Sequence, residues 1–437
     1  MPLRGSTAPP CTATYCASAK PIANRTPIEL LASTSRAAPS VHHLSSDTNC
    51  RKVRIPVPAL GHRPLTIGNS TARFPIIQGG MGVAISLSGL ASAVANAGGI
   101  GVIAAAGIGM NEPDFKSNFL QANKRALRHE IRMARSLSDG VIGLNVMMAH
   151  TNHADFFSTG IEEEIDIIFS GAGLPLTLPS YLNGNSRTKL VPIVSSARAT
   201  QVICKRWLNK YDYLPDAVVV EGPLAGGHLG FSQDQIFDPA FALEKLIPEV
   251  LEVVDSFGSR YGKKIPVIAA GGIYTGHDIR TKIALGVDGV QMGTRFVATH
   301  ECDADLKFKQ AYINAQPQDI VIINSPVGMP GRAVRNEYID DVRSGVKKPF
   351  NCPYHCISTC DYASAPYCIA QALMAAQRGR LNSGFAFAGA NAYRITEIIS
   401  VAELFAQLVA EYADVPLETS PALDSACRQT DNPTLSA

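Results

Sequence analysis

Long hydrophobic runs are missing from the 437-residue sequence. A membrane-spanning helix needs about 18 consecutive apolar residues, and residues 98–109, the most glycine-rich apolar stretch, are too short and too interrupted. We therefore expect no membrane partner. Cysteines are also few, ten in the whole chain, which does not fit a secreted scaffold held by disulfides. Reduced thiols and a cytoplasmic location are the default prediction.

Acidic residues are scarce in the first 73 positions, where nine Lys and Arg stand against only Glu29 and Asp47. The net charge of +2 therefore hides an excess of five acidic residues in the rest of the chain. A nucleic-acid-binding domain carries its basic stripe on the folded part, so we expect no nucleic-acid partner. Residues 1–60 are rich in Ser, Thr, Ala and Pro and show no hydrophobic periodicity. This composition predicts a disordered N-terminal extension, and a transit peptide remains an alternative.

From Phe74 onwards, short apolar runs alternate with stretches of helical periodicity, a pattern typical of repeated β–α units. Eight alternations in about 220 residues predict a (β/α)8 TIM barrel over residues 61–300, with a doubly wound open sheet as the alternative. The expected strands are Pro75–Gln78, Gly101–Ala104, Val141–Val146, Ile165–Phe169, Leu190–Val194, Ala217–Val220, Pro266–Ala269 and Gly289–Met292. The expected helices are Ser86–Ala97, Asp114–Ser138, Ala197–Lys210, Pro239–Phe257 and Gly276–Leu285.

The chain beyond the eighth run departs from a plain barrel. Asp303–Ala315 and Val401–Tyr412 have helical periodicity, whereas Ser325–Arg335 is too rich in Gly and Pro to predict a regular element. We expect residues 301–395 to form a cap over the barrel mouth, and we call them the cap segment. Residues 396–437 are expected to form a C-terminal helix and tail.

The stretch Ala217–Phe231, AVVVEGPLAGGHLGF, carries the clearest functional signal. Its valines predict a strand buried on both faces, and a glycine-rich turn with His228 follows directly. Loops at the carboxyl ends of parallel strands bind ligands in such folds, and an imidazole there can transfer protons near neutral pH. We therefore take His228 as the candidate catalytic residue. The alternative is a histidine that only hydrogen-bonds its own loop.

Other strand-end loops are glycine-rich or carry uncharged polar groups. Gly271–Gly272 after the seventh strand and Gly293–Thr294 after the eighth favour a phosphate site built from backbone N–H groups. No GxGxxG fingerprint and no Walker loop compete, so we expect a mononucleotide, and flavin mononucleotide (FMN) fits beside His228. The candidate cofactor-binding residues in these loops are Gln78, Gly79, Gly80, Met81, Asn145, Gly226, Gly227, Gly271, Gly272 and Gly293. Valine at Gly272 or at Gly293 is expected to cost FMN far more than it costs the fold.

Five ordered motifs resemble the nitronate monooxygenases, formerly called 2-nitropropane dioxygenases. The motifs are FPIIQGGMG from Phe74, GLNV from Gly143, EGPLAGGHLGF from Glu221, PVIAAGGI from Pro266 and QMGTRF from Gln291. The resemblance implies that His228 is the catalytic histidine. It also implies flavin contacts from Asn145, Glu221, Gly226, Gly272, Gln291, Met292, Gly293 and Thr294.

The resemblance implies FMN-dependent oxidation of alkyl nitronates or nitroalkanes by oxygen, which yields a carbonyl compound and nitrite, with His228 as general base. One alternative is an NAD(P)H-dependent flavin reductase of the enoyl-acyl-carrier-protein reductase or quinone reductase type. Another is a non-catalytic flavin or metal sensor. The family commonly has Gln where this chain has Glu221, and a carboxylate beside a flavin would need a proton or a neighbouring cation. Arg295 is the candidate cation.

A cysteine-rich run lies within the cap segment. It contains Cys352, His355, Cys356, Cys360 and Cys368. Such a set could bind zinc or an iron–sulfur cluster, but its spacing matches neither zinc-finger pairs nor ferredoxin runs. Buried, reduced thiols are the other interpretation, and the sequence leaves both open.

Overall fold

The structure is a computed structural model that describes residues 64–414 apart from 186, 347–350 and 353. The expected disordered extension, residues 1–60, and the tail beyond residue 414 lie outside the described residues. Within the described ranges, no helix combines the length and the apolar composition of a membrane span.

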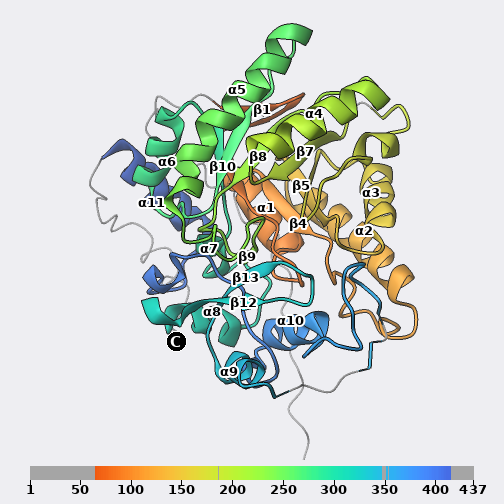
Figure 1. The fold of residues 1–437 in the computed structure, drawn as a ribbon, viewed down its shortest axis with the longest axis vertical. Coiled ribbons are helices and arrows are strands. Elements are labelled where there is room, and N and C mark those ends of the chain that lie inside the picture. The colour runs from red at the N-terminus through yellow and green to blue at the C-terminus, as the bar shows by residue number, and fades with distance from the viewer. Residues whose placement is uncertain (1–63, 186, 347–350, 353, 415–437) are drawn as a thin grey trace, which may run out of the picture. The chain divides into compact units, whose positions relative to one another are not determined.

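Eight parallel strands form one sheet in the order β3–β11–β10–β8–β7–β6–β5–β4. The sheet closes on itself because Ile77 of the first barrel strand makes a parallel bridge with Ile100, next to β4. Every strand lies within two residues of its expected run, which confirms the (β/α)8 TIM barrel (Figure 1). The strands are β3 (Ile76–Gln78), β4 (Gly101–Ala104), β5 (Ile142–Met147), β6 (Ile167–Gly171), β7 (Lys189–Val194), β8 (Val218–Glu221), β10 (Val267–Ala270) and β11 (Gly289–Met292).

Helices or helical turns follow the strands. They are α1 (Ser88–Ala97), α2 (Phe119–Leu137), α3 (His153–Glu162), η1 (Leu178–Tyr181), α4 (Ala197–Tyr211), η2 (Pro239–Phe241), α5 (Leu243–Tyr261), α6 (Gly276–Ala284) and α7 (Thr294–Val297). The last helix of the described residues, α11 (Val401–Ala413), lies more than 100 residues beyond β11 in the sequence, yet it contacts both α6 and α1. It therefore occupies the position of the eighth barrel helix. Capping boxes fix the starts of α6, at Thr275 and Asp278, and of α11, at Ser400 and Glu403.

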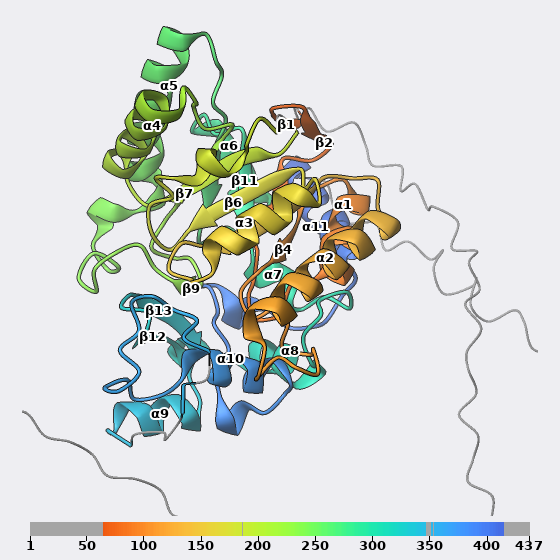
Figure 2. The same ribbon diagram turned by 90° about the vertical axis from the view of Figure 1, so that its right-hand side faces the viewer.

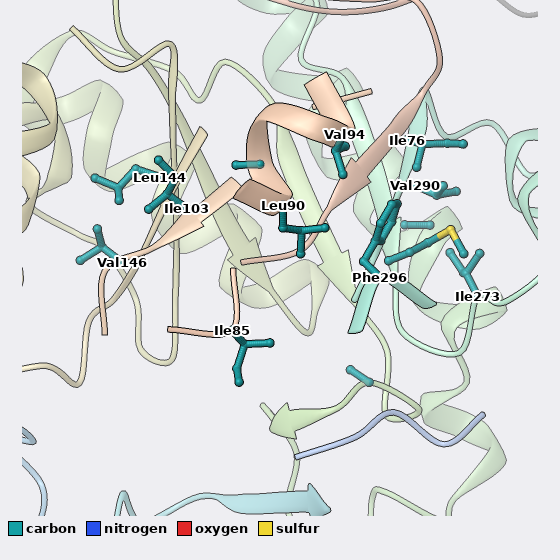
Figure 3. Close-up of a cluster of buried hydrophobic side chains, with 14 of the residues drawn as sticks. Ile76, Ile85, Leu90, Val94, Ile103, Leu144, Val146, Ile273, Val290 and Phe296 are labelled. Carbon is teal, nitrogen blue, oxygen red and sulfur yellow. The ribbon is translucent and has the colours of Figure 1, made fainter. Parts of the chain in front are cut away.

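The barrel buries two hydrophobic layers. Val219 belongs to the inner cluster that fills the barrel, while Val218 and Val220 belong to the outer cluster beneath the helices. This confirms that the valine run is a strand buried on both faces. Figure 3 shows part of the outer layer, where Leu90 of α1 shares the cluster with Val290 of β11.

A short hairpin, β1 (Leu65–Ile67) paired with β2 (Ser70–Ala72), precedes the barrel, and its apolar side chains join the inner cluster. The sequence did not predict this hairpin or helix α3.

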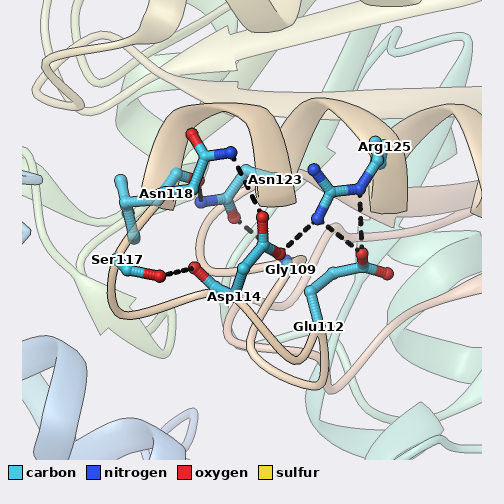
Figure 4. Close-up of polar contacts among 8 residues, drawn as sticks. Gly109, Glu112, Asp114, Ser117, Asn118, Asn123 and Arg125 are labelled. Carbon is cyan, nitrogen blue, oxygen red and sulfur yellow. Dashed lines mark hydrogen bonds and ion pairs between the residues drawn. The ribbon is translucent and has the colours of Figure 1, made fainter.

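At the other end of the molecule, helix α2 starts five residues later than expected. Residues 105–118 instead form a loop, in which Arg125 of α2 pairs with Glu112 and Asp114 (Figure 4).

The cap segment adds a small second layer of structure at the strand-end side of the barrel (Figure 2). It contains α8 (Leu306–Ile313), η3 (Pro317–Asp319), β12 (Ile320–Asn324), β13 (Pro330–Val334), α9 (Glu337–Arg343), α10 (Ile369–Gln377), η4 (Leu381–Ser383) and η5 (Ala392–Arg394). The prediction for Ser325–Arg335 was wrong in part, because β13 lies within it. Pro330 is tolerated since it is the first residue of the strand. Strand β13 pairs on one side with β12 and on the other with β9 (Gly227–His228).

The close approach of α6 and α11 generates a stability prediction. A Cβ on Gly276 would lie 2.1 Å from the carbonyl oxygen of Leu408 and 2.2 Å from the backbone nitrogen of Tyr412. Because both contacts are backbone, Gly276→Ala should lower the free energy of unfolding by about 1–3 kcal/mol, the scale of overpacking. Urea denaturation measures it, with Ala284→Ser at an exposed position of the same helix as control. Equal midpoints for parent and Gly276→Ala would contradict the packing described.

Candidate active site

A pocket of about 280 Å³ lies at the carboxyl ends of the barrel strands. The structure brings fourteen of the sequence-predicted site residues together around it. They are Gly79, Gly80, Met81, Asn145, Glu221, Gly226, Gly227, His228, Gly271, Gly272, Gln291, Met292, Gly293 and Thr294. The convergence follows from the fold, since parallel barrel strands all end at one face.

Gln78 does not line this pocket. Its side chain is fully buried, where the amide donates to the carbonyl of Gly79 and its oxygen accepts from the backbone N–H of Val102 at 2.9 Å. Gln78 therefore joins β3 to β4 across the closing seam of the barrel.

Glycines keep the pocket open, but they are not equivalent. Gly272 has φ +79°, and a Cβ there would meet the side chain of Leu224 at 2.9 Å. Gly293 has an ordinary φ of −111°, and its Cβ would meet only Met81, at 3.5 Å. Valine at 272 should therefore strain the fold itself, whereas valine at 293 would fill the pocket without a clash. The expectation that valine costs FMN more than it costs the fold therefore stays a prediction for Gly293 alone.

His228 lies in β9, on the loop after β8, and lines the pocket. Its Nε2 is 2.8 Å from Oγ of Ser325, and its ring makes an edge contact with Phe387 at 4.9 Å between centroids. Burial lowers the pKa of His228 to about 4. The imidazole is therefore neutral at physiological pH, and one of its ring nitrogens keeps a lone pair.

The cap segment holds the His228 loop in place. Gly331 of β13 pairs with His228, and Arg332 pairs with Gly227. The buried guanidinium of Arg332 also donates from Nη1 to the carbonyls of Pro223 and Ala225, at 2.6 Å each. Burial lowers the pKa of Arg332 to about 10, so it still carries its charge at neutral pH.

Residues 388–391 of the cap segment contact two further loops of the barrel mouth and also pack against the His228 loop. The N–H of Gly389 donates to Oγ1 of Thr294, and the side chain of Asn391 donates to the carbonyl of Gly272. A Cβ on Gly226 would lie 2.6 Å from the nitrogen of Gly389. Sequence reasoning missed Ser325, Arg332 and these residues because no local motif marks them.

Glu221, at the end of β8, also lines the pocket. Burial raises the pKa of its carboxyl to about 7. Arg295 does not act as its counter-ion, since the Arg295 guanidinium donates to the carbonyl of Tyr274 and to Gln407. A proton, rather than a neighbouring cation, therefore resolves the difficulty of placing a carboxyl at this position.

The pKa values of two ionisable side chains that line the pocket are shifted in opposite directions. His228 is a neutral base, and Glu221 holds its proton up to about pH 7. Separated pKa values of this kind define an acid and a base in one site. Among the described residues that line the pocket, none is Lys or Arg, and much of the remaining lining is apolar. The site can therefore exchange protons with an uncharged ligand in a largely apolar setting.

The cysteine-rich run lies outside this pocket. Among the described residues, no group of three or more His, Cys, Asp and Glu side chains is arranged to hold a metal ion. The cysteines of this run, Cys352, Cys356, Cys360 and Cys368, are free thiols.

A (β/α)8 barrel with a glycine-lined pocket at its strand ends fits a flavin-dependent oxidoreductase. A family model described as nitronate monooxygenase matches residues 63–169 and 159–411. The chain belongs to the nitronate monooxygenase family.

The individual relatives share less than a third of their aligned residues with this chain. The chain is 27% identical over 62% of its length to the (3aS,4S,5R,7aS)-5-hydroxy-7a-methyl-1-oxo-octahydro-1H-indene-4-carboxyl-CoA dehydrogenase of Mycobacterium tuberculosis, of which the match spans 66%. It is also 27% identical over 62% of its length to a probable nitronate monooxygenase of Staphylococcus aureus, of which 77% is covered. The structure of FabK from Thermotoga maritima aligns with a TM-score of 0.61 and 28% identity over 78% of this chain and 94% of that chain.

The raised pKa of Glu221 predicts a pH-dependent stability. The folded-state value lies above the ordinary 4.5, so its stabilising contribution is full below about pH 4.5 and disappears as pH rises through about 7. The free energy of unfolding of Glu221→Gln, relative to that of the parent, should therefore increase as the pH rises from 5 to 8. Urea denaturation of cofactor-free protein at the two pH values measures the difference, and Glu397→Gln, at an exposed position, is the control. A difference that does not change with pH would show that the carboxyl is not buried as described.

Proposed function

We propose that the protein oxidises alkyl nitronates or nitroalkanes with oxygen, using FMN, to a carbonyl compound and nitrite. The observation that carries this proposal is a half-buried histidine, neutral at physiological pH, that lines the pocket at the carboxyl ends of the barrel strands. A neutral imidazole is the form required of a general base.

FMN, when bound, supplies the electron-accepting and oxygen-reactive chemistry of the reaction. The residues present fit it. The turns at Gly271–Gly272 and Gly293–Thr294 offer backbone N–H groups for a phosphate, and Gly293 leaves open the space that a Cβ would fill. Asn145 and Gln291 would bind the polar edge of the ring system without adding charge.

His228 would remove the proton from the carbon next to the nitro group. Its Nε2 contact with Ser325 and its edge contact with Phe387 fix the orientation of the ring. The apolar lining, which includes Met147, Leu373 and Phe387, excludes water from the deprotonated carbon. A neutral nitroalkane enters such a pocket at lower cost than an anion, because no Lys or Arg side chain among its described lining residues would pair with a negative charge.

The lack of Lys and Arg among the described lining residues also favours a second candidate function. This candidate is an NAD(P)H-dependent flavin reductase that acts on an uncharged thioester or quinone. A relative with a CoA-thioester dehydrogenase name supports it as well. The two functions differ in their electron donor. Rapid anaerobic bleaching of the bound flavin by NADH or NADPH would favour the reductase, whereas bleaching by nitroethane alone favours the oxidation proposed here.

His228→Asn tests the role of the base. We expect this variant to keep its flavin and to lose turnover of neutral nitroethane by about 10²-fold or more, because asparagine cannot accept the proton. Turnover of pre-ionised ethyl nitronate should fall less, since its carbon has already lost the proton. Steady-state oxygen consumption with each substrate measures both rates. His129→Asn, at an exposed position of α2, is the matched control.

A His228→Asn variant that oxidises neutral nitroethane as fast as the parent would refute a base at this position. The reductase and the non-catalytic flavin sensor would then be the better accounts of the site.

A further inference from the structure

A second cavity, of about 180 Å³, shares no lining residue with the pocket described above. At about 30 Å³ per water molecule, it has room for a small organic molecule. Five of its eight lining residues carry a polar or charged side chain, namely Tyr274, Arg295, Thr396, Glu397 and Gln407. A cavity lined in this way suits a polar ligand rather than a hydrocarbon, because an apolar ligand would leave these groups without hydrogen-bond partners.

The second cavity is built by continuations of the loops that line the first pocket. Gly272 lines the first pocket, and Tyr274, two residues further along the loop after β10, lines the second cavity. Gly293 and Arg295 are related in the same way after β11. A third segment, within residues 389–397, contributes to both as well. The two cavities therefore share three chain segments but no residue.

Arg295 is the half-buried cation of this cavity, and its side chain is held in place. It donates from Nη1 to the carbonyl of Tyr274 at 3.2 Å and from Nη2 to the side-chain oxygen of Gln407 at 2.8 Å. Its guanidinium carbon lies 4.6 Å from the centre of the Tyr274 ring, a cation–π contact. A group fixed in this way loses little further conformational freedom when a ligand binds.

The charge of Arg295 has no carboxylate partner among the residues that the structure describes. A guanidinium carries five N–H donors, and the described residues accept from only two of those of Arg295. A half-buried cation with unused donors is best satisfied by an oxyanion, which forms charge-assisted hydrogen bonds with them.

A second guanidinium lies close by. The guanidinium carbon of Arg394 is 4.3 Å from the centre of the same Tyr274 ring, and Arg394 forms no ion pair with a described carboxylate. Two acidic side chains of the adjoining helices are already engaged with backbone N–H groups. Asp278 of α6 accepts from the N–H of Tyr274 at 3.0 Å, and Glu411 of α11 accepts from that of Gly276 at 2.7 Å.

We propose that this second cavity binds the phosphate group of a small molecule, with Arg295 as its principal ligand. The three unused N–H groups of Arg295 and the hydroxyl of Thr396 supply four donors, more than the two oxygens of a carboxylate would need. Glu397 opposes a negative charge, but it is exposed, so solvent and salt screen it. The proposal does not rest on the reaction proposed above, because the second cavity shares no residue with the first pocket.

The test is isothermal titration calorimetry of the full-length protein saturated with FMN, with inorganic phosphate and glycerol phosphate as probes. Arg295→Gln should weaken binding about 10-fold or more, the scale of a lost hydrogen bond to a charged group. Glu397→Gln should strengthen it about two- to five-fold at low salt, because an opposing charge is removed. Arg260→Gln is the matched control, since Arg260 also stacks on a tyrosine, Tyr261, at 5.4 Å, but lines neither cavity.

The two probes identify the source of the phosphate. Tighter binding of glycerol phosphate supports a phosphate ester as the ligand, and equal affinities support the free anion. No saturable binding by the parent, acetate bound as tightly as phosphate, or unchanged binding by Arg295→Gln would overturn the proposal. If Arg295→Gln does not fold, Glu397→Gln decides, because a phosphate site elsewhere would be indifferent to that charge.

A protein that retains no FMN would contradict the proposed function but not this site. The same titrations are then made without FMN. Binding that is lost in Arg295→Gln belongs to the second cavity and supports the proposal. Binding that is lost instead in Gly293→Val, a variant of the first pocket, overturns it.

Discussion

The pairing of β13 with β9 is the contact on which the rest of the site depends. It joins the cap segment to the two residues Gly227 and His228, and Arg332 strengthens it by holding the carbonyls of Pro223 and Ala225. The cap segment is thus part of the site itself: it supplies Ser325 and Phe387, the two side chains that orient the imidazole.

Burial, more than pairing with other charges, determines the pKa values of the ionisable side chains in the pocket. The same apolar surroundings remove the proton from His228 and keep one on Glu221, because burial disfavours the charged form of either group. The result is a neutral base and an acid in one pocket, and the acid loses its proton only near pH 7. Such a pocket favours an uncharged ligand and makes the position of the proton, rather than an ion pair, the variable that controls the site.

Local patterns predicted the barrel strands and most of the pocket, since valine runs and glycine turns report on their own neighbourhood. They could not predict contacts between distant segments. Ser325 lies 97 residues from His228, and Arg332 lies 109 residues from Pro223, so no spacing rule joins them. Gln78 resembles a ligand residue in its motif, yet it joins two strands. The strand within Ser325–Arg335 was missed because its content of Gly and Pro argues against a regular element, although it pairs with β12 and with the two-residue β9.

The most direct test of the central claim, a flavin held at the barrel mouth, is the identity of the cofactor in the purified protein. The account predicts a yellow protein that releases FMN on denaturation, identified by mass spectrometry. It also predicts that Gly293→Val is colourless yet unfolds at nearly the temperature of the parent stripped of FMN, because the added side chain meets open space in the fold. A colourless parent that cannot be reconstituted with FMN, or a Gly293→Val variant that binds FMN normally, would contradict it.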